Sequence, residues 1–369
     1  MAALQLGHAD DAILRSVNRL NYMTAAQVGR LLYPSACDEN RYVQRRLRRL
    51  AEADYLLRLR ELPTPRIGSA PHVFTLADQG RRYLSSRGVV LTSPYYRPSE
   101  ERQKAVDNPF MEHTLAAVDV LVAAEMLCRD YVVSMPSLLT ERQLKRMNIR
   151  VQPAGQPSPR LTAVIPDGWF VLTVGNHDPV CIALELDRGT EGQQHWRRKI
   201  AALVAWAEGP YREAFQADNL TVAVVVPTRA RLVQLIEWTG DELEAIGKTE
   251  LADIFLFTEA SPTATEPFDL FFSPLWHTAP TAGQLVSMLD APPSVDSDHA
   301  SRLVAPPSRP TDDKPTVSTQ WGEVEREIEL VEEELDEVEE EIRLEVETKV
   351  DIEDDDFPWT LSEGEEGRY

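Results

Sequence analysis

Residues 109–258 alternate between helical segments and short apolar runs, and this order is the strongest constraint on the fold. Residues 109–129 have the length and composition of a long helix, and residues 191–207 and 230–246 of two further helices. Thr190, with Gln193 three residues later, is expected to cap the second of these. The predicted strands share high apolar content and lengths of five to seven residues, at 131–135, 161–165, 169–174, 180–186, 220–226 and 253–258. The order predicts an α/β or α+β fold, a mixed sheet with flanking helices. Residues 140–159 are polar, and we expect a lid or a disordered segment there.

The first 93 residues predict a separate small domain. Helices are expected over 10–20, from the Thr24–Gln27 capping box onward, and from Asp38. Strands at 55–60 and 73–76 flank a turn rich in Pro and Gly at 63–71, and a last helix covers 77–86. This order is typical of a winged helix-turn-helix, which binds double-stranded DNA.

The third helix of this domain carries a basic face opposite its apolar stripe. Its side chains share the spacing i, i+3, i+4 and i+7 and belong to Arg41, Gln44, Arg45 and Arg48. Arg and Gln can make paired hydrogen bonds to guanine and adenine in the major groove. Arg66, in the predicted wing, is expected near the DNA backbone or the minor groove. The alternative is a basic helix face that only contacts solvent.

The net charge of −22 is unevenly distributed along the chain. Residues 321–369 hold 22 acidic residues against four basic ones, whereas residues 1–104 hold 17 basic against ten acidic. A basic beginning and an acidic end indicate two different partners. We expect a connector at 94–108, a sheet domain at 109–280 and a Pro/Ser-rich linker at 281–320. An acidic amphipathic helix at 321–350 and a disordered acidic tail at 351–369 would follow.

Apolar residues in the acidic segment recur at spacings of four and three, from Val324 to Ile342. The positions that flank this seam are all glutamates: Glu325, Glu327, Glu332, Glu334, Glu339 and Glu341. Two copies of this helix would repel one another. The expected partner is a basic protein or the basic N-terminal domain of the same chain, and a lone solvated helix is the alternative.

Cysteine usage and hydropathy predict a soluble protein of the cytoplasm. Cys37, Cys128 and Cys181 are far apart and have no spacing that suits zinc or a disulfide framework. The chain begins without a basic and apolar leader, and the apolar helix at 115–128 is too short to insert into a membrane.

Three acids lie at the ends of predicted neighbouring strands. Asp167 precedes one strand, and Glu185 and Asp187 stand at the end of the next, in the sequence Glu-Leu-Asp. Alternation places Glu185 and Asp187 on one face, where unpaired charges would be costly. A divalent metal ion, or a basic side chain such as Arg188 or Lys199, is therefore expected beside them.

The Pro166-Asp167 and Glu185-Leu186-Asp187 elements resemble the core of PD-(D/E)xK nucleases, which have a restriction-endonuclease-like fold. Together with the predicted winged helix, Glu112-His113, Thr140-Glu141-Arg142 and the stretch Glu185 to Glu191, they resemble the replication-relaxation family of plasmids and integrated mobile elements. The combination is also similar to MobC-type plasmid relaxases. The resemblance spans about residues 12–258 and leaves out the acidic tail.

The resemblance implies metal ligands at Asp167 and Glu185, which would bind Mg²⁺ or Mn²⁺. Asp187 occupies the position of the catalytic lysine, and Lys199 in the following helix is the candidate replacement. Glu112 or His113 would add a ligand or a base, or His113 would only support the helix start. An active protein would be a DNA endonuclease that nicks one strand during replication or DNA transfer.

Two alternatives without cleavage stay open. One is an accessory protein that uses a silent nuclease fold for docking. The other is a transcriptional regulator whose second domain senses a ligand.

Overall fold

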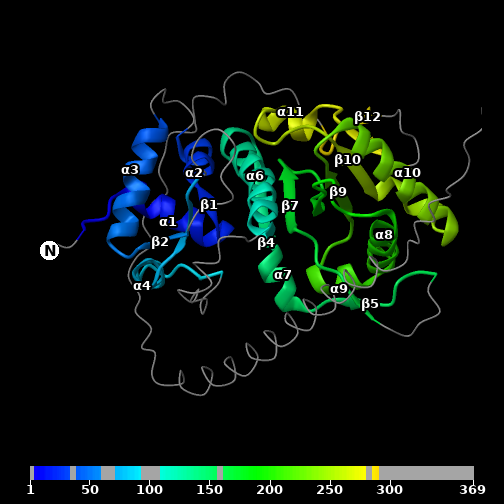
Figure 1. Ribbon diagram of the computed structural model, residues 1–369, viewed down its shortest axis with the longest axis horizontal. Helices are drawn as coiled ribbons and strands as arrows, with labels where there is room; N and C mark the ends of the chain where they lie inside the picture. The colour runs from blue at the N-terminus through cyan, green and yellow to red at the C-terminus, as the bar shows by residue number, and fades with distance from the viewer. Residues whose placement is uncertain are drawn as a thin grey trace, which may run out of the picture. The chain divides into compact units, whose positions relative to one another are not determined.

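The computed structural model describes residues 4–33, 39–59, 71–92, 109–155, 161–279 and 285–290. All of them belong to one compact unit, residues 1–295 (Figure 1). The connector at 94–108, Arg66, Cys37 and the acidic segments at 321–350 and 351–369 lie outside the described residues. No helix in the described ranges has the length and apolarity that a membrane span requires.

The N-terminal elements follow the predicted order. They are the helices α1 (His8–Leu20), α2 (Ala25–Leu32) and α3 (Glu39–Glu52), the strands β2 (Leu56–Leu59) and β3 (Val73–Leu76), and the helix α4 (Asp78–Ser86). The capping box of α2 is confirmed, because the Gln27 amide donates to Thr24 Oγ1 at 3.2 Å and the Thr24 amide donates to Gln27 Oε1 at 2.9 Å. A short strand that we did not predict, β1 (Met23–Thr24), completes an antiparallel sheet of order β1-β3-β2.

A mixed sheet of seven strands, in the order β12-β11-β10-β9-β8-β7-β4, forms the larger part of the unit. Its strands are β4 (Val133–Thr140), β7 (Gly168–Val174), β8 (Val180–Leu186), β9 (Thr221–Val225), β10 (Phe255–Thr258), β11 (Trp276–Thr278) and β12 (Leu285–Val286). Strand β8 is antiparallel to β7 and parallel to β9, which is parallel to β10. The predicted fold class is confirmed: a mixed α and β fold with a large mixed sheet between helices.

Helices cover both faces of this sheet (Figure 1). The helices α6 (Pro109–Asp130) and α11 (Pro267–Phe272) pack on one face, and α8 (Gln193–Ala207) and α10 (Arg229–Ala245) pack on the other. Strand β8 serves both cores, since Ile182 and Leu184 face α6 whereas Cys181 and Ala183 face α8 and α10. Residues 185 and 187 continue the second alternation, so Glu185 and Asp187 point toward α8 and α10, as the sequence pattern predicts.

Three expectations about local structure are wrong. The polar stretch from 140 contains a helix, α7 (Glu141–Met147), and β5 (Arg150–Val151), which pairs with β6 (Thr162–Ala163). A capping box begins α7, since the Thr140 amide donates to Gln143 Oε1 at 3.0 Å. Thr190 does not cap α8, whose N-cap is Gly192, because the residues before it are held in a loop. The last predicted strand is shorter, because residues 249–254 form a 3-10 turn, η1 (Thr249–Ile254).

The N-terminal helices share a core with α6, and polar contacts reinforce it. Gln27 Nε2 donates to the Leu115 carbonyl at 2.9 Å, and Arg30 Nη1 lies 3.0 Å from Asp119 Oδ1. On the neighbouring turn of α6, Glu125 lies 2.8 Å from Arg19 of α1. Burial raises the pKa of Glu125, and Arg19 only partly opposes this.

Glu125→Gln is therefore expected to raise the free energy of unfolding at neutral pH. The folded pKa of Glu125 lies above its unfolded value, so the wild type loses stability as the pH rises through the interval between the two values. The gain from Glu125→Gln should appear across that interval and vanish below the unfolded pKa. Urea unfolding at about pH 4 and about pH 7 tests this. Glu237→Gln, which changes an exposed glutamate of α10, is the control and should change stability little at either pH.

Candidate functional site

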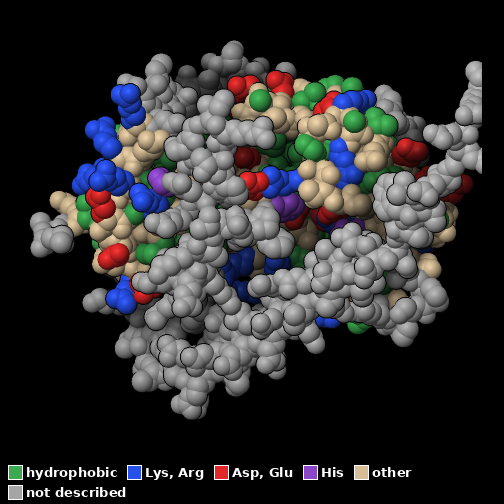
Figure 2. All heavy atoms as spheres, viewed as in Figure 1, with side chains coloured by type: hydrophobic (Ala, Val, Ile, Leu, Met, Phe, Trp, Pro, Cys, Tyr) green, Lys and Arg blue, Asp and Glu red, His purple; other side chains and the backbone are tan. Residues whose placement is uncertain are grey.

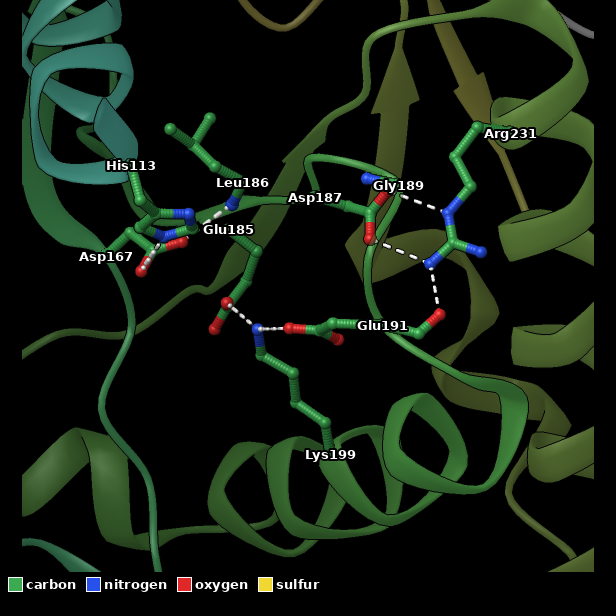
Figure 3. A network of polar contacts seen from close by, with 9 residues as sticks. All are labelled: His113, Asp167, Glu185, Leu186, Asp187, Gly189, Glu191, Lys199 and Arg231. Atoms are coloured by element: carbon green, nitrogen blue, oxygen red, sulfur yellow. Dashed lines mark hydrogen bonds and ion pairs between the residues drawn. The ribbon is translucent and has the colours of Figure 1, made fainter. Parts of the chain in front are cut away.

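The carboxylate of Asp167 is fixed just before β7, next to the end of β8. The backbone amide of Asp167 donates to the Leu184 carbonyl at 2.9 Å. The side-chain oxygen Oδ2 of Asp167 accepts from the Leu186 amide at 2.7 Å (Figure 3). Its second oxygen, Oδ1, lies 2.8 Å from His113 Nε2 of α6. This hydrogen bond raises the pKa of His113, although burial opposes it, and so favours the charged imidazolium.

Glu185 is buried and faces Lys199 from α8. Lys199 Nζ lies 2.6 Å from Glu185 Oε2 and 3.4 Å from Glu191 Oε1 (Figure 3). This contact is a short charge-assisted pair between the Lys199 ammonium and the buried Glu185 carboxylate. The structure thus brings together Asp167, Glu185 and Lys199, which the sequence proposes as site residues.

The charges around Glu185 and Lys199 favour protonation of the lysine over protonation of the glutamate. Burial raises the pKa of Glu185; Lys199 lowers it, and the nearby carboxylates of Asp167 and Glu191 raise it again. Burial alone would lower the pKa of Lys199, but the same three carboxylates raise it above its usual value. The ammonium therefore stays charged, and three carboxylates surround a single lysine.

Asp187 has a different environment from Glu185, although both point toward the same helices. Arg231 of α10 donates two hydrogen bonds to the Asp187 carboxylate, from Nε to Oδ2 at 2.7 Å and from Nη2 to Oδ1 at 2.8 Å (Figure 3). Arg231 Nη2 also donates to the Glu191 carbonyl at 2.6 Å. The Asp187 side chain is fully buried and that of Arg231 is 9% exposed.

Asp187 also closes the turn that follows β8. The Gly189 amide donates to Asp187 Oδ2 at 2.8 Å, and Gly189 has a φ of 82°, which a residue without a side chain adopts most easily. Asp187 thus organises the 187–192 loop rather than the interior of the Asp167–Glu185–Lys199 cluster. Each of the two acids therefore has its own cation: Lys199 pairs with Glu185, and Arg231 pairs with Asp187. Arg188, the other basic residue considered from the sequence, contacts Glu112 of α6 instead.

Arg231 is the site residue that the sequence analysis did not find. A signal for it exists, because β8 and β9 are parallel and the carboxyl ends of parallel strands meet at one edge of a sheet. The Asp187 amide donates to the Val225 carbonyl at 3.0 Å, which brings the start of α10 beside Asp187. Once this strand pairing is known, a basic residue in the first turn of α10 is the natural partner of Asp187, but the sequence analysis named only Arg188 and Lys199.

The site offers few side chains that could bind a metal ion. Among the described residues, no three His, Cys, Asp or Glu side chains are grouped so as to hold a metal ion. Asp167 and Glu185 offer two carboxylates, which is the number that Mg²⁺ commonly takes from a protein when substrate phosphate and water supply its other ligands.

The basic face of α3 is exposed as the sequence predicts. Arg41, Gln44, Arg45 and Arg48 are all exposed, and Val43, Leu47 and Leu50 on the opposite side are buried. Lys and Arg side chains gather over α3 in the space-filling view (Figure 2). Arg48 pairs with Glu52 at 2.7 Å, but both side chains are more than half exposed.

The described part of the chain combines a mixed sheet between helices, carboxylates and a lysine at one edge of that sheet, and a basic helix, α3, that precedes them in the chain. The family model for replication-relaxation proteins matches residues 14–219. This protein belongs to the replication-relaxation family, which indicates a role in the replication or relaxation of mobile elements. The match includes α3, Asp167, Glu185 and Lys199, whereas Arg231 lies beyond it. No curated protein and no solved structure matches the chain.

Proposed function

We propose that this protein binds double-stranded DNA of a plasmid or integrated mobile element through α3 and nicks one strand at the Asp167–Glu185–Lys199 cluster. The observation that carries the proposal is the 2.6 Å contact between Lys199 and Glu185. It puts a charged lysine against Glu185 and within the electrostatic influence of Asp167, although Asp187 occupies the position where PD-(D/E)xK nucleases have their lysine. The winged-helix domain and the nuclease-like fold are part of this proposal.

The residues of the cluster suit a divalent cation in charge. The three carboxylates of Asp167, Glu185 and Glu191 face one lysine and one histidine. Asp167 and Glu185 would hold Mg²⁺ or Mn²⁺. The ion would polarise the scissile phosphate and lower the pKa of an attacking water.

The side chains of the chain itself have separate tasks. Lys199 carries a positive charge at the cluster and would stabilise negative charge that develops on the phosphate. His113 and the Leu186 amide hold the two oxygens of Asp167 in one orientation. Arg231 holds Asp187 and the loop that joins β8 to α8, so that Glu191 stays beside Lys199.

A second function is favoured by the same contacts. Asp167 and Glu185 each already have a basic partner, and the described residues hold no three-ligand group. A silent nuclease fold that docks DNA or a partner protein would have this arrangement. The acidic C-terminal segment is proposed to contact a basic protein or the basic N-terminal domain in either case.

A plasmid nicking assay separates the two functions. The substrate is supercoiled DNA that carries the intergenic region next to the gene, with Mg²⁺ or Mn²⁺. We expect the wild type to form open circles and Asp167→Ala and Glu185→Ala to form none while still binding the DNA. Glu213→Ala, which removes an exposed acid of α9 (Pro210–Phe215), is the control and should nick normally. DNA binding by the wild type without open circles would support the silent fold.

A further inference from the structure

Arg188 is an exposed cation at the edge of the Asp167–Glu185–Lys199 cluster, and neither the family resemblance nor the proposed chemistry gives it a role. We propose that Arg188 binds a phosphate of the DNA strand that enters this cluster, and that Glu112 holds the arginine in place until DNA arrives. This inference rests on the proposed DNA binding and names a residue that positions the substrate.

The contacts of α6 place Arg188 beside the cluster. Glu112 and His113 are consecutive residues of that helix; Glu112 contacts the Arg188 guanidinium and His113 contacts Asp167. A strand whose phosphate lies at Asp167 and Glu185 would therefore pass close to this guanidinium.

The backbone on either side of Arg188 is fixed. Asp187 accepts hydrogen bonds from Arg231 and from the Gly189 amide, and Arg231 also binds the Glu191 carbonyl. The loop therefore has a defined conformation while the Arg188 side chain extends from it. A binding group on a rigid base loses less entropy when it orders around a ligand.

Exposure distinguishes Arg188 from the other cations of the site. The side chains of Arg188 and Glu112 are 41% and 36% exposed, whereas those of Lys199 and Arg231 are 23% and 9% exposed. Exposed ion pairs are weak and are screened by salt, so a phosphate can replace Glu112 at little cost. The planar guanidinium suits two-point contact with phosphate oxygens.

The test measures binding of a fluorescein-labelled random-sequence duplex to the full chain in EDTA, over a series of salt concentrations. Loss of one phosphate contact should reduce the slope of log K against log salt by about one, so we expect this for Arg188→Gln. Arg188→Lys should keep the slope, because the charge remains, but bind more weakly. Arg212→Gln, which removes an exposed arginine of α9, is the charge-matched control and should keep the wild-type slope.

Glu112 provides a sharper test of the exchange. Glu112→Gln should strengthen DNA binding by releasing Arg188, and this gain should be absent when Arg188→Gln is also present. A slope for Arg188→Gln equal to that of the wild type would overturn the inference. So would a gain from Glu112→Gln that persists without Arg188, because it would reflect general repulsion. The binding test is run in EDTA and does not depend on cleavage. Failure of the plasmid nicking assay would therefore contradict only the proposed function. Failure to bind DNA would overturn the proposed function and the role of Arg188 together.

Discussion

Replacing Arg231 by methionine is expected to lower the free energy of unfolding by about 3–5 kcal/mol, the usual cost of leaving one member of a buried ion pair without its partner. Asp187 is fully buried and takes two hydrogen bonds from this guanidinium. Methionine fills similar space but donates no hydrogen bond, so among the described residues only the Gly189 amide would still donate to the buried carboxylate. The shift of the urea unfolding midpoint measures the loss.

Arg197→Met is the matched control for this prediction. Arg197 also joins α8 to α10, through a contact of 2.6 Å with Glu242, but its side chain is 34% exposed. This pair is only partly buried, and solvent-exposed pairs contribute about 0.2–1 kcal/mol, so the control should shift the midpoint less than Arg231→Met does. Equal shifts for the two variants would contradict a special role of the Asp187–Arg231 pair. The double variant Asp187→Leu with Arg231→Met should regain part of the stability, since an apolar pair carries no unpaired charge.

Local patterns predicted much of the fold because the physics behind them is local. The β8 strand was predicted with the observed bounds, Val180–Leu186, since a short and strongly apolar segment of that length is typical of a buried strand. The capping box at Thr24 and Gln27 marked the start of α2. The same signal at Thr140 and Gln143 was present before α7, where the polar composition of the stretch suggested a lid or disorder. Composition there outweighed a more specific hydrogen-bonding pattern.

Pairing between distant residues was harder to predict. The sequence indicated that Glu185 and Asp187 share a face and need cations, and the structure supplies two different ones. Lys199 was identifiable because it lies in the next helix, but Arg231 is 44 residues from Asp187 and becomes its neighbour only through the parallel pairing of β8 and β9. Strand order in a sheet depends on the whole chain, so a local pattern could not assign that partner. Thr190 shows the same limit, since the loop contacts of Glu191 moved the start of α8 beyond it.

Lys199→Met is expected to reduce strand nicking by about 100- to 1000-fold, the usual loss when one preorganised electrostatic group is removed from an active site. Two effects act together. The phosphate loses the charge that would stabilise its transition state, and Glu185 loses the cation that lowers its pKa, so it binds a proton more readily and becomes a poorer ligand. Initial rates of open-circle formation with Mg²⁺ and Mn²⁺ give the measurement. Glu191→Gln, which removes the more distant carboxylate at 3.4 Å from Lys199, is the control and should retain most of the rate.

Lys199→Met is also expected to lower the free energy of unfolding, because it leaves the buried Glu185 without its partner. The single variant should unfold at a lower urea concentration, and the double variant Glu185→Gln with Lys199→Met should recover, since no buried charge remains. Nicking should stay absent in the double variant. A Lys199→Met chain that nicks at the wild-type rate would exclude Lys199 as the proposed catalytic lysine. Recovery of stability without recovery of nicking would show that Glu185, Lys199 or both serve cleavage, because a purely structural ion pair would be dispensable once both of its charges are gone.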